Sequence, residues 1–403
     1  MSQTPRQASR PARGARTALV LAGLLLGGCS TVQVSGPVQP PEPVDATPPV
    51  AARWEFDAGS RPPADRDGYR PPIRLAVLLP LTGSLATAAA PVRDGLLAGY
   101  YGETRRRPEL RFYDTTGTAA GAIAAYALAV SEGADQVVGP LGRDEVEAVF
   151  RQAQPSVPVI ALNRPDVAPP RNSASYALAP EDEGIAAADY LASRSARRVL
   201  VLSAGDDSAR RSIAAFAARL QAAGGAIVQT IAVVGESPAD VVPLLQGAAQ
   251  REGGVDAIFL ALRGPQARVV APQLFTSGLS GKVRVATSQL ASGSGNAQQD
   301  RLLDGIAFPT DAWSAGGVPG LPNAASTGNA LPTARGPAAR LFAFGLDAWL
   351  LSAYLERLAT GADTDLRGAS GTLHIDAEGH VQRTPAWSTY SGGYVVPLAA
   401  GGG

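Results

Sequence analysis

The stretch "IRLAVLLPLTGSLATAAAPVRDGLLAGYY", residues 73–101, decides the fold class. Its first part is a run of branched apolar residues, which is typical of a strand buried on both faces, and it ends in the polar residues 82–84. Its second part has the spacing of a helix, because one apolar stripe recurs every four positions: Ala88, Val92, Leu96 and Tyr100. A strand followed directly by a covering helix is the repeating unit of a parallel α/β sheet.

The same alternation continues along the chain. The predicted strands are ELRFYD (109–114), DQVVGP (135–140), VPVIALN (157–163), RRVLVLSA (197–204), AIVQTIAV (226–233), VDAIFLAL (255–262) and KVRVAT (282–287). The predicted helices are 118–132, 143–152, 181–194, 207–223, 237–250 and one that opens at Gly264-Pro265. These units exceed one ordinary domain, so the sequence predicts an α/β fold with two doubly wound parallel-sheet lobes.

The last quarter of the chain departs from this alternation. Residues 314–337 are rich in Gly, Pro, Ala and Ser and are predicted to be a low-complexity surface insertion. A long apolar helix is predicted over 338–359. "GTLHID" (371–376) and "HVQRT" (380–384) flank a turn at 377–379 and predict a small antiparallel piece, which "GGYVVPL" (392–398) follows.

Residues 1–28 have the pattern of an export signal peptide. They carry four arginines and no acid, followed by an apolar run of about a dozen residues, too short to cross a bilayer. The only cysteine, Cys29, comes directly after Gly27 and Gly28. The sequence Leu26-Gly27-Gly28-Cys29 resembles a bacterial lipobox, which implies a diacylated cysteine at the mature N-terminus. The alternative is a leftover cysteine with no role.

The segment after the cysteine is predicted to be a tether. Residues 29–72 contain recurrent proline and no apolar period, so we expect a disordered or polyproline-like chain that carries the folded part away from the membrane. Ser30 stands where an aspartate would retain many lipoproteins in the inner membrane. By that resemblance the sequence implies an outer-membrane anchor.

Charge and motifs exclude several classes of function. The chain has 35 basic and 35 acidic residues, and the net charge is about −4 without the signal segment, so a nucleic-acid partner is not expected. The sequence has no Walker A loop, no G-x-S-x-G elbow and no S-x-x-K motif. His374 and His380 could form a metal pair with Asp376, but the turn at Gly379 favours two surface residues beside a turn. The sequence therefore predicts a protein that is not an enzyme and that binds no metal ion and no cofactor.

Polar residues that follow predicted strands are the candidates for a ligand cleft, because ligands of open α/β sheets bind at the carboxyl ends of the strands. The alternative is that they are only caps and turns. The candidates are Thr82, Gly83 and Ser84 after the first strand, Gly139, Pro140 and Leu141 after the third, Asn163 and Arg164 after the fourth, and Ser203 and Asp206 in the second lobe.

Four segments resemble the penicillin-binding protein activator family of lipoproteins. They are residues 73–101, "QVVGPLGRDEVEAV" (136–149), "VPVIALNRP" (157–165) and "ARLFAFGLDAWLLSAYL" (339–355). The resemblance implies a type I periplasmic-binding-protein architecture, like that of Leu/Ile/Val-binding proteins, with three crossings between the lobes near 178, 288 and 360. The expected parts are lobe 1 (73–178), lobe 2 (179–288), a return to lobe 1 (289–360) and a return to lobe 2 (361–403).

The resemblance also implies a function. Members of the family are non-enzymatic outer-membrane lipoproteins that bind and activate a bifunctional penicillin-binding protein, which is a peptidoglycan synthase, in the periplasm. The best-known members carry a helical-repeat domain where this sequence has the tether, so we expect docking here to rely on the two lobes. The alternative function is a periplasmic solute receptor that binds an amino acid, a peptide or a cell-wall fragment between the lobes.

Overall fold

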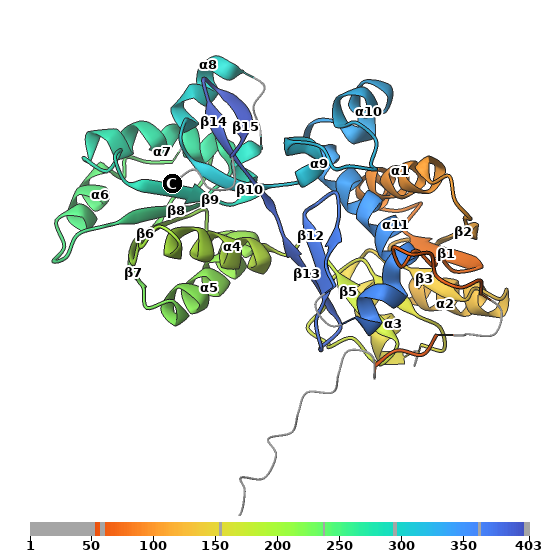
Figure 1. Cartoon of the computed structure of the whole chain (residues 1–403). Coiled ribbons are helices and arrows are strands. Elements are labelled where there is room, and N and C mark those ends of the chain that lie inside the picture. Colours follow the sequence, from red (N-terminus) through yellow and green to blue (C-terminus); the bar gives the residue numbers. More distant parts are fainter. Residues whose placement is uncertain are drawn as a thin grey trace, which may run out of the picture. The chain divides into compact units, whose positions relative to one another are not determined.

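A computed structural model describes residues 53–56, 61–152, 155–236, 238–292, 296–361 and 364–398. The predicted signal peptide, Cys29, Ser30 and the first part of the predicted tether lie outside these residues. The described part contains two large sheets, each with helices packed on it (Figure 1). This confirms the predicted class of two α/β lobes.

The first sheet has eight strands in the order β11-β12-β13-β5-β4-β3-β1-β2. The strands are β1 (Arg74–Leu79), β2 (Glu109–Asp114), β3 (Gln136–Val138), β4 (Val159–Ala161), β5 (Ser173–Tyr176), β11 (Leu366–Arg367), β12 (Thr372–Ile375) and β13 (His380–Thr384). Strands β13, β5, β4, β3, β1 and β2 pair in parallel, whereas β11 and β12 add antiparallel neighbours at one edge. The nearly apolar central strands are buried except for Arg74 at the start of β1, as a sheet covered on both faces requires.

The second sheet has seven strands in the order β15-β14-β10-β9-β8-β6-β7. The strands are β6 (Arg198–Ser203), β7 (Ala226–Ala232), β8 (Ala257–Ala261), β9 (Val283–Ala286), β10 (Ala307–Thr310), β14 (Ala386–Ser391) and β15 (Tyr394–Pro397). Its first five strands along the chain pair in parallel, and β14 and β15 close one edge as an antiparallel pair.

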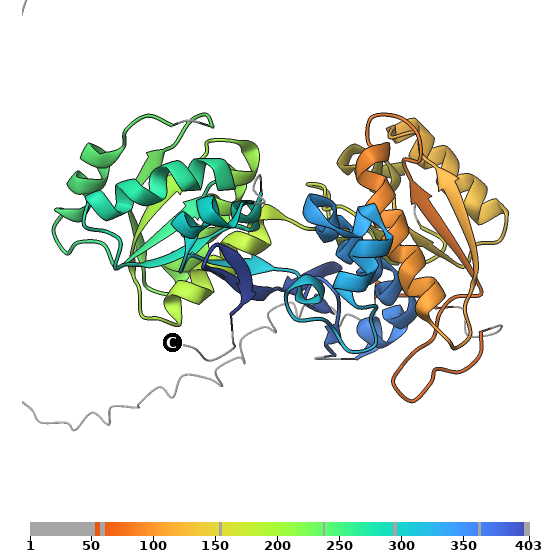
Figure 2. The same cartoon turned by 90° about the horizontal axis from the view of Figure 1, so that it is seen from above.

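Helices follow the strands as the apolar spacing predicts. In the first lobe they are α1 (Ala86–Gly102), α2 (Ala119–Ser131), α3 (Arg143–Gln152), α9 (Ala312–Ala315), α10 (Ala324–Ala330) and α11 (Ala339–Thr360). In the second lobe they are α4 (Pro180–Ala192), α5 (Asp207–Ala222), α6 (Val242–Ala249), α7 (Gly264–Thr276) and α8 (Ala297–Asp300). Figure 2 shows both sets from above.

The chain crosses between the two sheets three times. The first crossing lies between Tyr176 and Pro180, the second at Asp311 and the third at Pro385. The predicted positions of the second and third crossings, near 288 and 360, are wrong. Strand β10 belongs to the second sheet, so the second lobe extends to 310, and β11–β13 belong to the first sheet, so the chain leaves the first lobe only after 384. Strand β10 was missed because it has only four residues and contains Pro309, a residue type that argues against a central strand.

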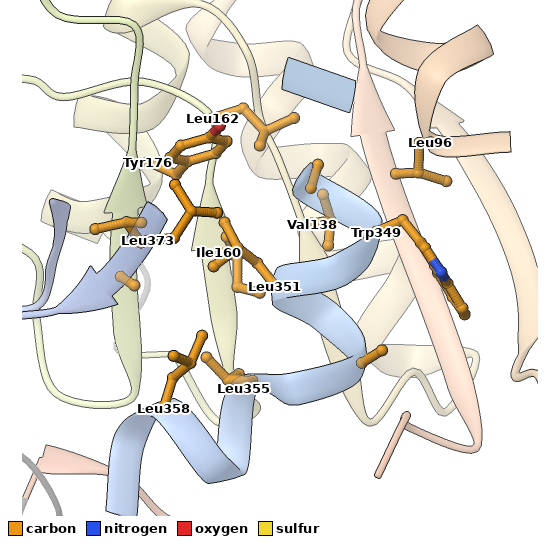
Figure 3. Close-up of a cluster of buried hydrophobic side chains, with 14 of the residues drawn as sticks. Leu96, Val138, Ile160, Leu162, Tyr176, Trp349, Leu351, Leu355, Leu358 and Leu373 are labelled. Carbon is orange, nitrogen blue, oxygen red and sulfur yellow. The ribbon is translucent and has the colours of Figure 1, made fainter. Parts of the chain in front are cut away.

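Helix α11 is the core of the first lobe. By length and composition it could cross a membrane, but 72% of its apolar window is buried inside the fold, as in a core helix. Figure 3 shows Leu351, Leu355 and Leu358 of this helix next to side chains from the first sheet. Its backbone also approaches α1 closely, because a Cβ on Gly345 would lie 2.1 Å from the carbonyl oxygen of Val92.

The prediction of a tether is wrong for the part of residues 29–72 that the structure describes. Within the described residues, Trp54 and Tyr69 are buried in the core of the first lobe, with exposed fractions of 7% and 3%. The Arg70 guanidinium forms an ion pair of 2.6 Å with Glu356 of α11. Residues 53–56 and 61–72 therefore belong to the folded lobe, since aromatic side chains and ion pairs in this stretch attach it to α11 and β5.

The low-complexity segment 314–337 lies mostly at the surface and contains short helical elements. It contains α10 and two short 3₁₀ turns, Pro332–Ala334 and Gly336–Ala338. Ala334 is buried with Trp313 and Phe342, and Thr333 donates a hydrogen bond of 2.8 Å to Asp94 of α1. Small residues here allow close packing on α1 and α11 rather than a loose surface loop.

Candidate functional site

The polar residues after β1 are held by the chain itself. The Thr82 hydroxyl donates a 2.6 Å hydrogen bond to the carboxylate of Asp114, which also accepts hydrogen bonds from backbone N–H groups of Leu81 and Thr116. These bonds, led by that of Thr82, lower the pKa of Asp114 below its usual value. Gly83 and Ser84 complete this turn before α1.

The predicted residues after β3 and β4 lie next to each other. Gly139 needs a positive φ of 102°, and a Cβ there would meet the carbonyl oxygen of Leu78. The Pro140 carbonyl accepts a hydrogen bond from the backbone N–H of Leu162. The Asn163 amide donates a 2.9 Å hydrogen bond to the carbonyl oxygen of Leu141, which ties the two loops together.

Arg164 points from the first lobe to the second. Its guanidinium forms a 3.0 Å ion pair with Asp182 on α4. Burial raises the pKa of Asp182, although attraction to Arg164 opposes this change. The second carboxylate oxygen of Asp182 is buried and has no hydrogen-bond partner in the described part of the chain.

The two predicted residues of the second lobe act as a turn and a cap. The Ser203 hydroxyl accepts a hydrogen bond from the backbone N–H of Gly205. Asp206 caps α5 by accepting from the N–H of Ala209 at 2.9 Å, and it also forms a 3.1 Å ion pair with Arg263. The ten predicted residues thus form two polar loop clusters, one in each lobe, and Arg164 is the member that contacts the other lobe.

A buried ionic cluster lies beside the crossings, and the sequence did not indicate it. The guanidinium of Arg340, at the start of α11, donates hydrogen bonds to the Glu183 carboxylate on α4 and to the Ser288 hydroxyl after β9. Ser288 also donates to Glu183 from its hydroxyl at 2.7 Å and from its backbone N–H at 2.9 Å. The first-lobe helix α11 is therefore joined to two elements of the second lobe.

The charges of this cluster set its pKa values. Burial alone would raise the pKa of Glu183, but the positive charges of Arg340 and Arg383 and the hydrogen bonds from Ser288 leave it below the usual value. Burial likewise opposes the charge of Arg340, yet Glu183 and Asp311 raise its pKa. The pair is consequently ionised at neutral pH and holds both lobes by charge-assisted hydrogen bonds.

A second buried group lies under the first sheet. The Asp347 carboxylate of α11 accepts hydrogen bonds from the Tyr176 hydroxyl at 2.9 Å and from the backbone N–H groups of Ala369 and Ser370. Burial raises the pKa of Asp347 to about 6, although these hydrogen bonds act in the opposite direction. The one sequence signal for this group was a lone acid inside the apolar run "LFAFGLDAWLL".

A cavity of about 520 Å³ lies next to the ionic cluster. Elements of both lobes contribute to it, among them the loop after β9, the end of β10 and the first turn of α11. It is lined by Glu183, Ser288, Gln289, Ala291, Ser292, Phe308, Pro309, Thr310, Asp311, Ser314, Gly336, Pro337, Ala339, Arg340, Arg383 and Val395. None of the ten predicted loop residues belongs to this lining.

The histidines make no metal centre with their neighbours. His374 pairs across the hairpin with Gln382, and the ring of His380 hydrogen-bonds to the Ser175 hydroxyl at 2.7 Å. Burial lowers the pKa of His380. Within the described ranges no group of three His, Cys, Asp or Glu residues could hold a metal ion.

Two sheets of this topology, with three crossings between them, define the type I periplasmic-binding-protein architecture. The family model described as "LppC putative lipoprotein" matches residues 69–393, so the chain belongs to the LppC family.

Curated relatives support this assignment at moderate identity. The chain is 27% identical to "Penicillin-binding protein activator LpoA" of Escherichia coli K12, over 87% of the chain and 57% of the relative. It is 29% identical to the protein of the same name from Mannheimia succiniciproducens, over 81% of the chain and 55% of that relative. The chain thus spans about half the length of the curated relatives it matches.

Solved structures share the fold. The C-domain of LpoA from Haemophilus influenzae, described as a regulator of PBP1A, superimposes with a TM-score of 0.68 at 23% identity, covering 81% of this chain and 100% of that one. A "putative branched-chain amino acid ABC transporter" structure from Chromobacterium violaceum superimposes with a TM-score of 0.63 at 30% identity, covering 79% of this chain and 100% of the other.

Proposed function

We propose that the protein is a non-enzymatic outer-membrane lipoprotein that binds and activates a bifunctional penicillin-binding protein in the periplasm. The observation that carries the proposal is the match of the LppC family over residues 69–393, joined to relatives named as penicillin-binding protein activators. The described part of the chain corresponds to the whole C-domain of a relative that regulates PBP1A. In this proposal the two lobes provide the docking surface.

The bonds of the buried carboxylates support a role in holding a binding surface in place. The buried carboxylates Glu183 and Asp347 have their oxygens engaged by side chains and backbone N–H groups of the same chain. The bonds of Glu183 join the two lobes at the crossings, which sets the relative position of two surfaces that a partner protein could bind.

Binding to the synthase can be tested lobe by lobe. Two aromatic side chains are strongly exposed on different lobes, Tyr101 on α1 at 70% and Phe275 on α7 at 76%. Tyr101→Ser and Phe275→Ser should leave folding nearly unchanged, because both are surface positions. We expect wild-type protein to bind the immobilised full-length synthase, and we expect one of the two variants to bind more weakly if its lobe carries the docking face. Wild-type protein that binds none of the organism's bifunctional synthases would contradict the proposal.

The lipid anchor is tested at Cys29. We expect Cys29→Ala to abolish membrane association, because the thiol is the only side chain in the chain that could accept the acyl group of a lipobox. The measurement is fractionation of cell envelopes followed by immunodetection. Ser30→Ala is the matched control, since it changes the neighbouring residue and keeps the cysteine, and it should remain in the membrane fraction. A Cys29→Ala protein that still sediments with membranes would refute the anchor.

The second candidate function is a solute receptor with a ligand between the lobes. It is favoured by the shared fold with the Chromobacterium structure. The polar loops after β1, β3, β4 and β6 supply its proposed cleft residues. Most of their polar atoms already bond within their own lobe, so this candidate has less support than docking to a synthase.

A further inference from the structure

Asp311 occupies a position where an aspartate normally caps a helix, but it does not cap. It is the N-cap residue of the short helix α9, at the second crossing, and its side chain makes no capping hydrogen bond. The residue is only 7% exposed and lines the cavity at the crossings. No described residue donates a hydrogen bond to this carboxylate, and it faces the cavity, so a donor within the cavity would stabilise it.

The neighbouring cations do not satisfy this carboxylate. Arg340 uses its two terminal nitrogens on Glu183 and Ser288. Arg383 is 7% exposed, donates from Nη1 to the carbonyl oxygen of Ser370, and has Nε and Nη2 without a partner among the described residues. The positive charges of both guanidinium groups act on the Asp311 carboxylate from a distance and oppose the increase of its pKa by burial. No ion pair of the described chain includes Asp311.

The rest of the cavity is shaped for a small organic ligand. Its volume of about 520 Å³ falls in the range of small-molecule sites, which combine apolar walls with a few polar groups. The apolar walls come from both lobes: Phe308, Pro309, Pro337, Ala339 and Val395. The charges of the lining balance, since Glu183 and Asp311 face Arg340 and Arg383.

We propose that this cavity binds a small ligand that carries a protonated primary amine on an apolar body, with the ammonium group at the Asp311 carboxylate. An ammonium supplies three hydrogen-bond donors, which the carboxylate lacks at present. The apolar body would cover Phe308, Pro309 and Val395. The site is separate from the polar loops at the strand ends, and the proposal does not rest on activation of a synthase.

A metal ion fits these residues less well. Divalent cations in proteins need several oxygen ligands or a set of nitrogen and sulfur ligands. Asp311 is a single carboxylate, and the described residues contain no group of three possible metal ligands. The two nearby guanidinium groups would also repel a divalent cation more strongly than a singly charged ammonium.

The test uses the folded protein and pairs of probes that differ only in the amine. Leucinamide represents a free small amine, and tetra-alanine represents the N-terminus of a peptide. The N-acetylated form of each has the same body without the charge. Binding is followed by isothermal calorimetry and by chemical-shift changes in the protein. We expect at least one free amine to bind and its acetylated form to bind at least about tenfold more weakly, as for loss of a buried charged hydrogen bond. The stronger of the two amines identifies the source.

Three variants make the test specific to the cavity. Asp311→Asn should abolish the preference for the free amine, whereas Asp166→Asn removes an exposed carboxylate outside the lining and should not change it. Val395→Trp fills the cavity from a position that is 48% exposed and should block binding while Asp311 remains. Failure of both amines to bind the folded wild-type protein, or equal binding by Asp311→Asn, would overturn the proposal. Neither result bears on synthase activation, which is measured separately.

Discussion

Two buried aspartates, Asp311 at the second crossing and Asp347 under the first sheet, should make the stability of the protein depend on pH. Burial raises the pKa of Asp311 and of Asp347 to about 6, from a usual value of 3.8. In each case the folded state binds its proton more tightly than the unfolded state. The folded state therefore holds more protons between about pH 4 and 6, and the free energy of unfolding should fall as pH rises through this window.

Replacing Asp311 should remove part of this dependence. We expect Asp311→Asn to be more stable than the wild type at pH 7, by up to about 3 kcal/mol, because the cost of ionising a buried carboxylate disappears. Asp347→Asn should instead lose stability, since an amide cannot accept from Ala369, Ser370 and Tyr176 together. Urea unfolding over a pH series measures both. An Asp311→Asn variant with the slope of the wild type between pH 4 and 6 would show that this carboxylate is not responsible.

Among the elements, the contact between α1 and α11 depends on glycine. Because a Cβ on Gly345 would lie 2.1 Å from the Val92 carbonyl oxygen, any side chain there must push the helices apart. We expect Gly345→Ala to lower the free energy of unfolding by about 2 kcal/mol or more. Gly247→Ala on α6 is the matched control, since its Cβ would meet nothing within 4 Å, and the better helix propensity should raise stability by up to about 1 kcal/mol. Equal effects of the two changes in urea unfolding would refute the close packing.

The segment before β1 is a second element with a specific test. Trp54 is 7% exposed and stacks on Phe56 with a ring separation of 5.9 Å, so residues 53–56 should stabilise the first lobe. We expect Trp54→Ala to cost about 3 kcal/mol, in the range for a buried aromatic residue. Tyr101→Ala, at a residue that is 70% exposed, serves as the control and should change stability by less than about 0.5 kcal/mol. Matching denaturation midpoints for wild type and Trp54→Ala would show that this segment adds nothing.

The sequence predicted the elements that have a strong period and missed those that do not. Apart from β5, the strands between 73 and 287 follow apolar runs and the helices follow four-residue apolar stripes, so the sequence predicted the type of each element. Strand β5 reads SASY and β10 reads AFPT, and neither has an apolar run or a clear alternation. The pairing of these two strands is decided by neighbouring strands. The second crossing was misplaced because β10 was missed, and the third because β11–β13 were assigned to the second lobe.

Prediction of the candidate site had a similar limit. The polar loops at the strand ends follow from the parallel topology, and their role in a ligand cleft stays a prediction. The cluster of Glu183, Ser288 and Arg340 joins residues more than 100 positions apart in the chain, as the contact of Glu183 with Ser288 illustrates. A local sequence pattern cannot predict such a contact, because the two residues meet only after both lobes have folded.

The folded part of the protein consists of two lobes that hydrogen bonds and ion pairs of the chain join at the crossings. The LppC family match and the LpoA-named relatives support a role in regulating peptidoglycan synthesis, and the anchor proposed at Cys29 would place the lobes at the outer membrane. The described residues correspond to the C-domain of the Haemophilus relative. The central claim is therefore that these two lobes are enough to activate a synthase.

One measurement tests this claim most directly. The rates of glycan polymerisation and of cross-linking by each full-length bifunctional synthase of the organism are followed while soluble protein from residue 30 onward is titrated in. We expect the protein to stimulate at least one synthase and the effect to saturate. We also expect stimulation to be weakened by the same variant, Tyr101→Ser or Phe275→Ser, that weakens binding. Unchanged rates for every synthase, with protein shown to be folded by its unfolding transition, would contradict activation by the two lobes.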